Sequence, residues 1–306
     1  MSFFDLKIAA IYIFQIVLGT LGNLSLLIHY ICLHCRGDRE QSTDLILRHL
    51  TVANFLVILS IGIPQTMAAF GLNDFLKDFE CNLVLYVHRV ARGVSISSTC
   101  LLNVFQAITI SPRDLRCANL KLTVPKYIGP STLLFWALHM LINVIFPIYG
   151  SSKRNNKTTS NQNKLGYCSL SLNDNIKFSL FTALISSHDV VCLGLMSWAS
   201  GSMVFILYRH KQRVRHIYRS HVSHRSSPET KASQSILVLV STFVLCYALS
   251  SITYTYLAFF GNPSLWLLNA SPFITRCFPT ISPFIFISSD PRNLKNTFGP
   301  VSLLEK

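Results

Sequence analysis

Charged residues are scarce in this chain of 306 residues. Asp, Glu, Lys and Arg make up 13% of it, and only 13 residues are acidic. Soluble domains carry about 25% charged residues, so this composition argues against a soluble two-domain enzyme. The 21 Phe and 11 Tyr, together with long aliphatic runs, exclude an intrinsically disordered chain. Nine Cys are too few for a small scaffold held together by disulfides.

The few charges that are present have a strong positive excess, with a net charge of +14. In a soluble protein this excess would suggest nucleic acid as a partner. In a membrane protein it more often reflects basic cytoplasmic loops. Half of the residues are hydrophobic. We therefore expect contact with membrane lipid and no binding of nucleic acid.

Apolar segments long enough to cross a bilayer occur seven times along the chain. A hydrocarbon core about 30 Å thick requires roughly 20 residues in helical conformation. The remaining segments are too short to hold an independent domain. The sequence predicts one all-α, seven-helix membrane domain followed by a short cytoplasmic tail, residues 290–306. The predicted spans are 8–31, 47–70, 83–110, 127–149, 178–208, 235–260 and 270–289.

Lys and Arg indicate which side of the membrane each loop occupies, since they are enriched in cytoplasmic loops. Most of them fall in inner segments if the amino terminus is extracellular and the carboxyl terminus is cytoplasmic. The polar loop 151–173 carries four basic residues and departs from the rule without reversing it. Asn156 begins a glycosylation sequon in this loop, where an extracellular location would allow its use. We predict a multi-pass protein of the plasma membrane in this orientation.

Two cysteines, Cys81 and Cys168, fall on the predicted outer side. That compartment is oxidising, so a disulfide between them could persist and hold the loop over the end of the bundle. The alternative is that they are two unrelated thiols.

Ionisable residues inside spans are costly and therefore mark candidate sites. His88 and Arg92 lie one helical turn apart, and Ser95 continues their face. Arg276 is placed at a similar depth in the seventh span, and His188 and Asp189 lie in the outer half of the fifth. These residues could bind the anionic group of a ligand, such as a sulfate or carboxylate. The alternative is that Asp189 only neutralises Arg92 or Arg276.

Several longer strings resemble vomeronasal type-1 receptors, and the resemblance covers nearly the whole chain. They include HLTVAN at 49–54, GIPQTMAAFGL at 62–72, HRVARGVSI at 88–96, FQAITISPR at 105–113, PKYIGPS at 125–131, GYC at 166–168, WASGSMVFIL at 198–207, RHKQRV at 209–214 and QSILVLVS at 234–241. The resemblance implies a G protein-coupled receptor for pheromones, with a small chemosignal as ligand. We expect this ligand to be anionic or steroid-like. It also implies coupling to a heterotrimeric G protein of the inhibitory class. It implies no enzymatic activity, cofactor or metal.

The chain departs from the larger rhodopsin-like group at several positions. Asn54 stands where that group usually has Asp, and Gln106 lies in the slot of its Asp-Arg-Tyr motif. The next arginine, Arg113, follows a proline and cannot simply replace the motif. We expect the G protein to contact Gln106, Arg113 and the basic run that extends the fifth span. This run contains Arg209, Lys211, Arg213 and Arg215. The same run could instead attract anionic lipid.

The sequence leaves three other functional classes as alternatives, each less favoured than a vomeronasal receptor. A bitter-taste receptor is the nearest alternative, because it also lacks the Asp-Arg-Tyr motif. A small-solute transporter is disfavoured because we find no paired, interrupted helices. An intramembrane enzyme is disfavoured because the sequence contains neither H-E-x-x-H nor G-x-S-x-G.

Overall fold

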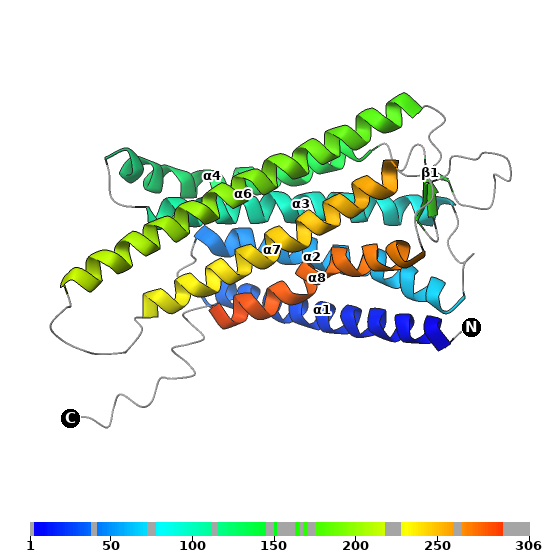
Figure 1. Ribbon diagram of the computed structural model, residues 1–306, viewed down its shortest axis with the longest axis horizontal. Coiled ribbons are helices and arrows are strands. Elements are labelled where there is room, and N and C mark those ends of the chain that lie inside the picture. The colour runs from blue at the N-terminus through cyan, green and yellow to red at the C-terminus, as the bar shows by residue number, and fades with distance from the viewer. Residues whose placement is uncertain are drawn as a thin grey trace, which may run out of the picture.

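A computed structural model of the chain describes residues 3–37, 42–71, 78–111, 115–144, 150–151, 163–165, 168–170, 175–217, 228–259 and 265–289. Within these residues the fold is a bundle of seven α-helices, as predicted (Figure 1). The helices are α1 (Phe3–Cys35), α2 (Ser42–Ala69), α3 (Asp78–Ile110), α4 (Leu115–Ile142), α6 (Asn175–Ile217), α7 (Pro228–Phe259) and α8 (Leu265–Ser289).

The helices are generally longer than the predicted spans. Four of them, α1, α2, α3 and α6, are long and apolar enough to cross a membrane by length and composition alone. Helix α6 continues from the apolar region into the basic run and ends at Ile217, whereas the predicted span ends at 208. Helix α4 ends at Ile142, before the predicted limit of 149, and residues 145–149 lie outside the described part of the chain.

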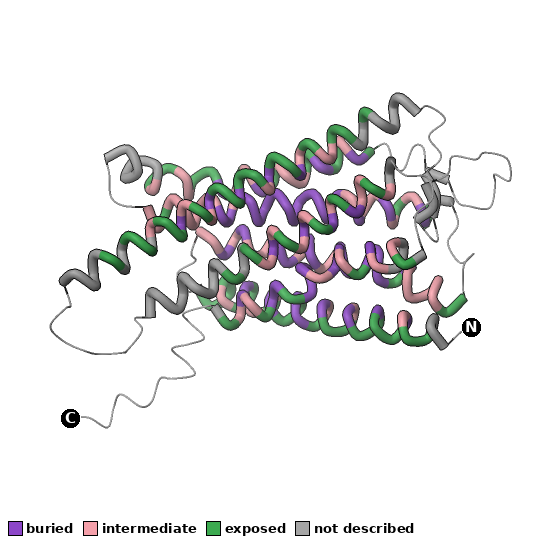
Figure 2. The backbone as a smooth tube through the Cα atoms, in the orientation of Figure 1, coloured by how far each residue is buried: buried purple, intermediate pink, exposed green. Residues whose placement is uncertain are grey.

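Helix α3 forms the axis of the bundle. Every residue from 90 to 100 is buried, and Figure 2 shows this central stretch as continuous purple. Neighbours α2, α4 and α6 all pack against it. A helix that is enclosed on all sides must satisfy its polar side chains within the protein. This explains why the polar candidates gather along α3.

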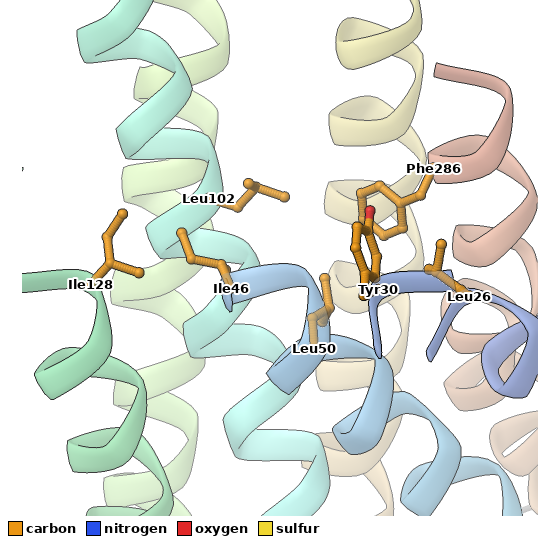
Figure 3. Close-up of a cluster of buried hydrophobic side chains, with 7 residues drawn as sticks. All are labelled: Leu26, Tyr30, Ile46, Leu50, Leu102, Ile128 and Phe286. Atoms are coloured by element: carbon orange, nitrogen blue, oxygen red, sulfur yellow. The ribbon is translucent and has the colours of Figure 1, made fainter. Parts of the chain in front are cut away.

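Apolar contacts join α3 to the other helices at two levels. One cluster contains residues from α1, α2, α3, α4 and α8, namely Leu26, Tyr30, Ile46, Leu50, Leu102, Ile128 and Phe286 (Figure 3). A second cluster joins α3, α6, α7 and α8, and contains Ile96, Cys100, Cys192, Met196, Phe243, Tyr247 and Phe278.

Close packing between α1 and α8 has a clear cause in the sequence. Pro283 has no backbone N–H, so it cannot bond the carbonyl of Pro279 one turn earlier. The side-chain amide of Asn23 donates to that carbonyl at 2.9 Å and to the Gly19 carbonyl at 2.8 Å. The Pro279 carbonyl, which Pro283 leaves without its helical partner, is therefore satisfied by Asn23, and this bond holds α1 and α8 together.

A small antiparallel sheet, which the sequence did not predict, lies at the end of the bundle where α1 begins (Figure 1). Its strands β1 (Gly150–Ser151), β2 (Asn163–Leu165) and β3 (Cys168–Leu170) are arranged in the order β1-β3-β2. Helix α8 ends at the opposite end of the bundle. The described strands of the polar loop therefore lie at the same end as the start of the first helix.

Candidate functional site

A buried ion pair joins three helices in the half of the bundle nearest the sheet. Arg92 on α3 donates through Nη1 to Oδ2 of Asp189 on α6 at 2.9 Å, and both side chains are almost fully buried. Ser251 on α7 accepts from Nη2 of Arg92 at 2.8 Å and donates to the same carboxylate oxygen at 2.7 Å. The sequence left open which arginine Asp189 neutralises, and the structure pairs it with Arg92.

The ring of Tyr254 on α7 lies among the basic groups of α3. The guanidinium carbons of Arg89 and Arg92 are each 5.0 Å from its centre, within the range of cation–π attraction. Its hydroxyl forms a hydrogen bond of 3.1 Å with Nε2 of His88. His88 is therefore held against α7 and does not line the cavity described below.

A second set of hydrogen bonds runs deeper in the bundle, and we call it the polar chain: Asn54, Ser95, Tyr247 and Ser282. Ser95 donates to Oδ1 of Asn54 at 2.6 Å. Because that bond uses its one proton, Ser95 must accept from the Tyr247 hydroxyl, 2.7 Å away. The Asn54 amide donates to Ser282 at 3.0 Å. The polar chain thus connects α2, α3, α7 and α8.

Two histidines flank α3 on the side away from the polar chain. Nε2 of His139 on α4 and Nε2 of His188 on α6 lie 3.0 and 3.1 Å from Oγ of Ser97, and their rings meet edge to face. The His139 ring rests directly on Gly93, where a side chain of any size would collide with it. Gly93 is therefore required for α4 and its histidine to approach α3.

A cavity of about 310 Å³ lies between α3, α4 and α6. Of the six predicted ligand contacts, Arg92, His188 and Asp189 line it. His88, Ser95 and Arg276 do not. The lining residues are Arg89, Arg92, Gly93, His139, Ile142, Asn143, Leu184, Ile185, Ser187, His188, Asp189 and Val191.

Arg276 on α8 is completely buried. Its Nε donates to the Pro272 carbonyl at 3.1 Å, and its guanidinium lies 4.8 Å from the centre of the Tyr12 ring on α1. The sequence placed it beside the other candidates because of its depth alone, and the structure does not bring it to the cavity.

Sequence reasoning missed His139, Gly93, Ser251 and Tyr254. His139 satisfied the criterion that selected the other residues, since it is an ionisable group inside a predicted span. Ser251 and Tyr254 could not be selected in this way, because they are neutral and neutral polar residues are frequent in this chain.

Cys81, at the start of α3, is fully buried and disulfide-bonded. The Cys168 side chain lies outside the described part of the chain. Its backbone begins β3, which pairs with β1, and β1 contacts α3.

On the opposite half of the bundle, Gln106 is half-buried on α3 and Arg209 is exposed on α6. Lys211, Arg213 and Arg215 belong to α6, but their side chains are outside the described set, as are Arg113, Asn156 and the tail 290–306. Among the described residues, no group of His, Cys, Asp or Glu could hold a metal ion.

Comparison with known proteins decides between the families that the sequence left open. The chain is 58% identical over 279 residues to human vomeronasal type-1 receptor 2, covering 91% of this chain and 71% of the relative. It is 53% identical over 277 residues to human vomeronasal type-1 receptor 4, covering 90% and 92%. A zebrafish (Danio rerio) olfactory receptor class A-like protein 1 is 30% identical over 285 residues, covering 93% and 89%. The sequence model of the vomeronasal organ pheromone receptor family matches residues 6–298, and the chain belongs to this family of membrane receptors.

Proposed function

We propose that this receptor binds a small chemosignal in the outer half of its helix bundle and activates a heterotrimeric G protein, of the inhibitory class, at the cytoplasmic face. One observation carries the proposal: in a member of the vomeronasal pheromone receptor family, the buried Arg92–Asp189 pair lies on the wall of a cavity of ligand size.

The bonds around this pair suggest how a ligand would act. Arg92, Asp189 and Ser251 belong to α3, α6 and α7, so a ligand group that bonds any of them competes with contacts between helices. A ligand shifts a conformational equilibrium only by its differential affinity for the two states. Binding that favours a different spacing of these helices would change the shape of the cytoplasmic end.

The proposed orientation has the amino terminus and the sheet outside the cell. In this arrangement Cys168 is the partner of Cys81, because β3 starts at Cys168 and its neighbouring strand touches α3. Asn156 would then be open to glycosylation. The basic extension of α6 would face the cytosol, where Arg209 and the following Lys and Arg residues could meet an acidic surface of the G protein.

Activation by a ligand tests the proposal directly. The receptor is expressed with a promiscuous G protein and a calcium indicator, then exposed to steroids, steroid sulfates and volatile compounds. We expect at least one class of compound to raise calcium only in receptor-expressing cells. When the native G protein replaces the promiscuous one, we expect an inhibitor of inhibitory-class G proteins to block the response. A ligand-gated current in cells without G proteins would contradict the proposal and favour a channel.

A further inference from the structure

The cavity beside Arg92 has an open side between α4 and α6. Both helices pack against α3, yet within the described residues they make few contacts with each other. The rim residues Leu184 and Val191 on α6 are 53% and 59% exposed. Exposed residues, drawn green in Figure 2, recur along α6. In a helix of a membrane receptor such an apolar, exposed face meets lipid chains. The opening therefore lies toward the bilayer.

The lining residues also separate this cavity from the central mouth of the bundle. All of them belong to α3, α4, α6 or the turn that follows α4, and none comes from α1, α2, α7 or α8. Tyr254 and Ser251 of α7 are held by Arg92 on its other side. A molecule in this cavity would consequently contact the outer flank of the bundle.

The inner end of the cavity is polar, whereas its rim is apolar. The polar end contains two arginines, Arg89 and Arg92, against one carboxylate, Asp189. His139 and His188 also line this end, with Nε2 of each ring bonded to Ser97 and Nδ1 of His188 3.4 Å from Asp189, and the side chain of Asn143 completes the wall. The two guanidinium groups at this end suit an anionic group, while the aliphatic side chains Leu184 and Val191 suit a hydrocarbon tail.

We propose that the opening between α4 and α6 is a membrane-facing site for a small anionic amphiphile, which reaches it through the lipid. The head group lies near Arg89 and the two histidines, and the tail lies between Leu184, Val191 and the bilayer. The volume of about 310 Å³ restricts the site to small molecules, near the lower end of the range for ligand cavities. This inference rests on the proposed function, since it assigns the chemosignal a chemical class and a route of entry.

A photoreactive probe tests the site without any signalling readout. The full-length receptor is placed in lipid nanodiscs and incubated with decanoate carrying a diazirine near the end of its chain. After irradiation, the labelled residues are identified by mass spectrometry. We expect labelling of the facing segments 139–143 and 184–191 that saturates and is displaced by excess unlabelled decanoate. A probe with the same chain and a trimethylammonium head should label lipid-facing residues without saturation.

Two adjacent valines provide a matched pair of variants. Val191 lines the cavity, whereas Val190 is 68% exposed and does not line it. We expect Val191→Trp to fill the opening and reduce the saturable labelling about tenfold or more, equivalent to about 1.4 kcal/mol of affinity. Val190→Trp should leave it unchanged.

Labelling that does not saturate, or that falls equally in both variants, would overturn the inference. Saturable labelling confined to α7 and α8 would also overturn it, since the ligand would then enter through the central mouth. Neither result depends on G protein coupling. The calcium experiment can therefore succeed when this one fails, which distinguishes the two proposals.

Discussion

At Gly93 the backbone of α3 lies against the ring of His139, with no room for a methyl group. This contact fixes the separation of α3 and α4 at the level of the cavity. Other glycines on the helices have open space around them, among them Gly194 on α6. Gly93 and Gly194 are both glycines within helices, but only Gly93 has another side chain against it.

We predict that Gly93→Ala lowers receptor stability by about 1–3 kcal/mol, because overpacking displaces the His139 ring. The matched change Gly194→Ala should be neutral or slightly stabilising, since alanine is the better helix former by about 1 kcal/mol. Thermal unfolding of the purified receptors and antibody staining at the cell surface measure the difference. Equal melting temperatures for the two variants would show that His139 moves aside without cost.

The Arg92–Asp189 pair is buried between α3 and α6, where neither charge can be solvated by bulk water. Removing one member leaves the other charge buried without its partner, which costs about 3–5 kcal/mol. Removing both members often costs little, because the desolvation of both charges is also removed. The stability effect of the pair and its effect on the ligand can therefore be separated.

We predict that Asp189→Leu and Arg92→Met each reduce surface expression strongly, whereas the double variant regains most of it. The double variant should still fail to respond to an anionic chemosignal that activates the unmodified receptor. Surface staining and calcium responses are compared at matched expression. A double variant that responds normally would restrict the pair to a structural role.

Among the elements, α7 is attached to α3 by two separate links, one through Ser251 and Tyr254 and one through Tyr247 of the polar chain. The deeper link is close to the middle of the bundle, where it lies against the apolar cluster of α3, α6, α7 and α8. Any movement of the amino-terminal half of α7 relative to α3 must break or stretch it.

We predict that Tyr247→Phe raises basal G protein activity, because the bond from Tyr247 to Ser95 is lost while the ring packing stays. Hydrogen bonds between membrane helices contribute about 0.6 kcal/mol on average and at most about 1.7 kcal/mol, which corresponds to a change in the population ratio of about threefold to about 18-fold. Tyr208→Phe, at an exposed position on α6, is the control. An unchanged or lower ligand-free signal at equal expression would argue against the polar chain as a restraint.

Sequence reasoning recovered the helices better than the contacts between them. Hydropathy found all seven, because each needs a long apolar run regardless of its neighbours. Hydropathy could not find the sheet, because strands of two or three residues, such as Gly150–Ser151, are too short to show an alternation of apolar and polar residues. The rule on buried charges found Arg92 and Asp189. Asn54, Tyr247 and Ser282 escaped it because they are neutral, and their partners lie on three other helices at no fixed sequence spacing.

At the scale of the whole molecule, the seven helices in the described part of the chain place the start of α1 and the end of α8 at opposite ends of the bundle (Figure 1). We predict that an epitope tag at the amino terminus is stained on intact cells, whereas one at the carboxyl terminus is stained only after permeabilisation. We also expect Asn156→Gln to abolish a mobility shift produced by glycosidase treatment. Two tags in one compartment, or glycosylation at a site on the opposite end, would refute the orientation.

Helix α3 is completely buried between residues 90 and 100, and this burial limits which substitutions the receptor can accept during evolution. We predict that saturation mutagenesis scored by surface display finds low tolerance at every position of this stretch. Helix α1, which turns Phe14 and Leu21 toward lipid, should instead show tolerant positions recurring every three or four residues. New ligand preferences would then arise most readily on α4 and α6, where a wall of the cavity can vary without disturbing the axis of the bundle.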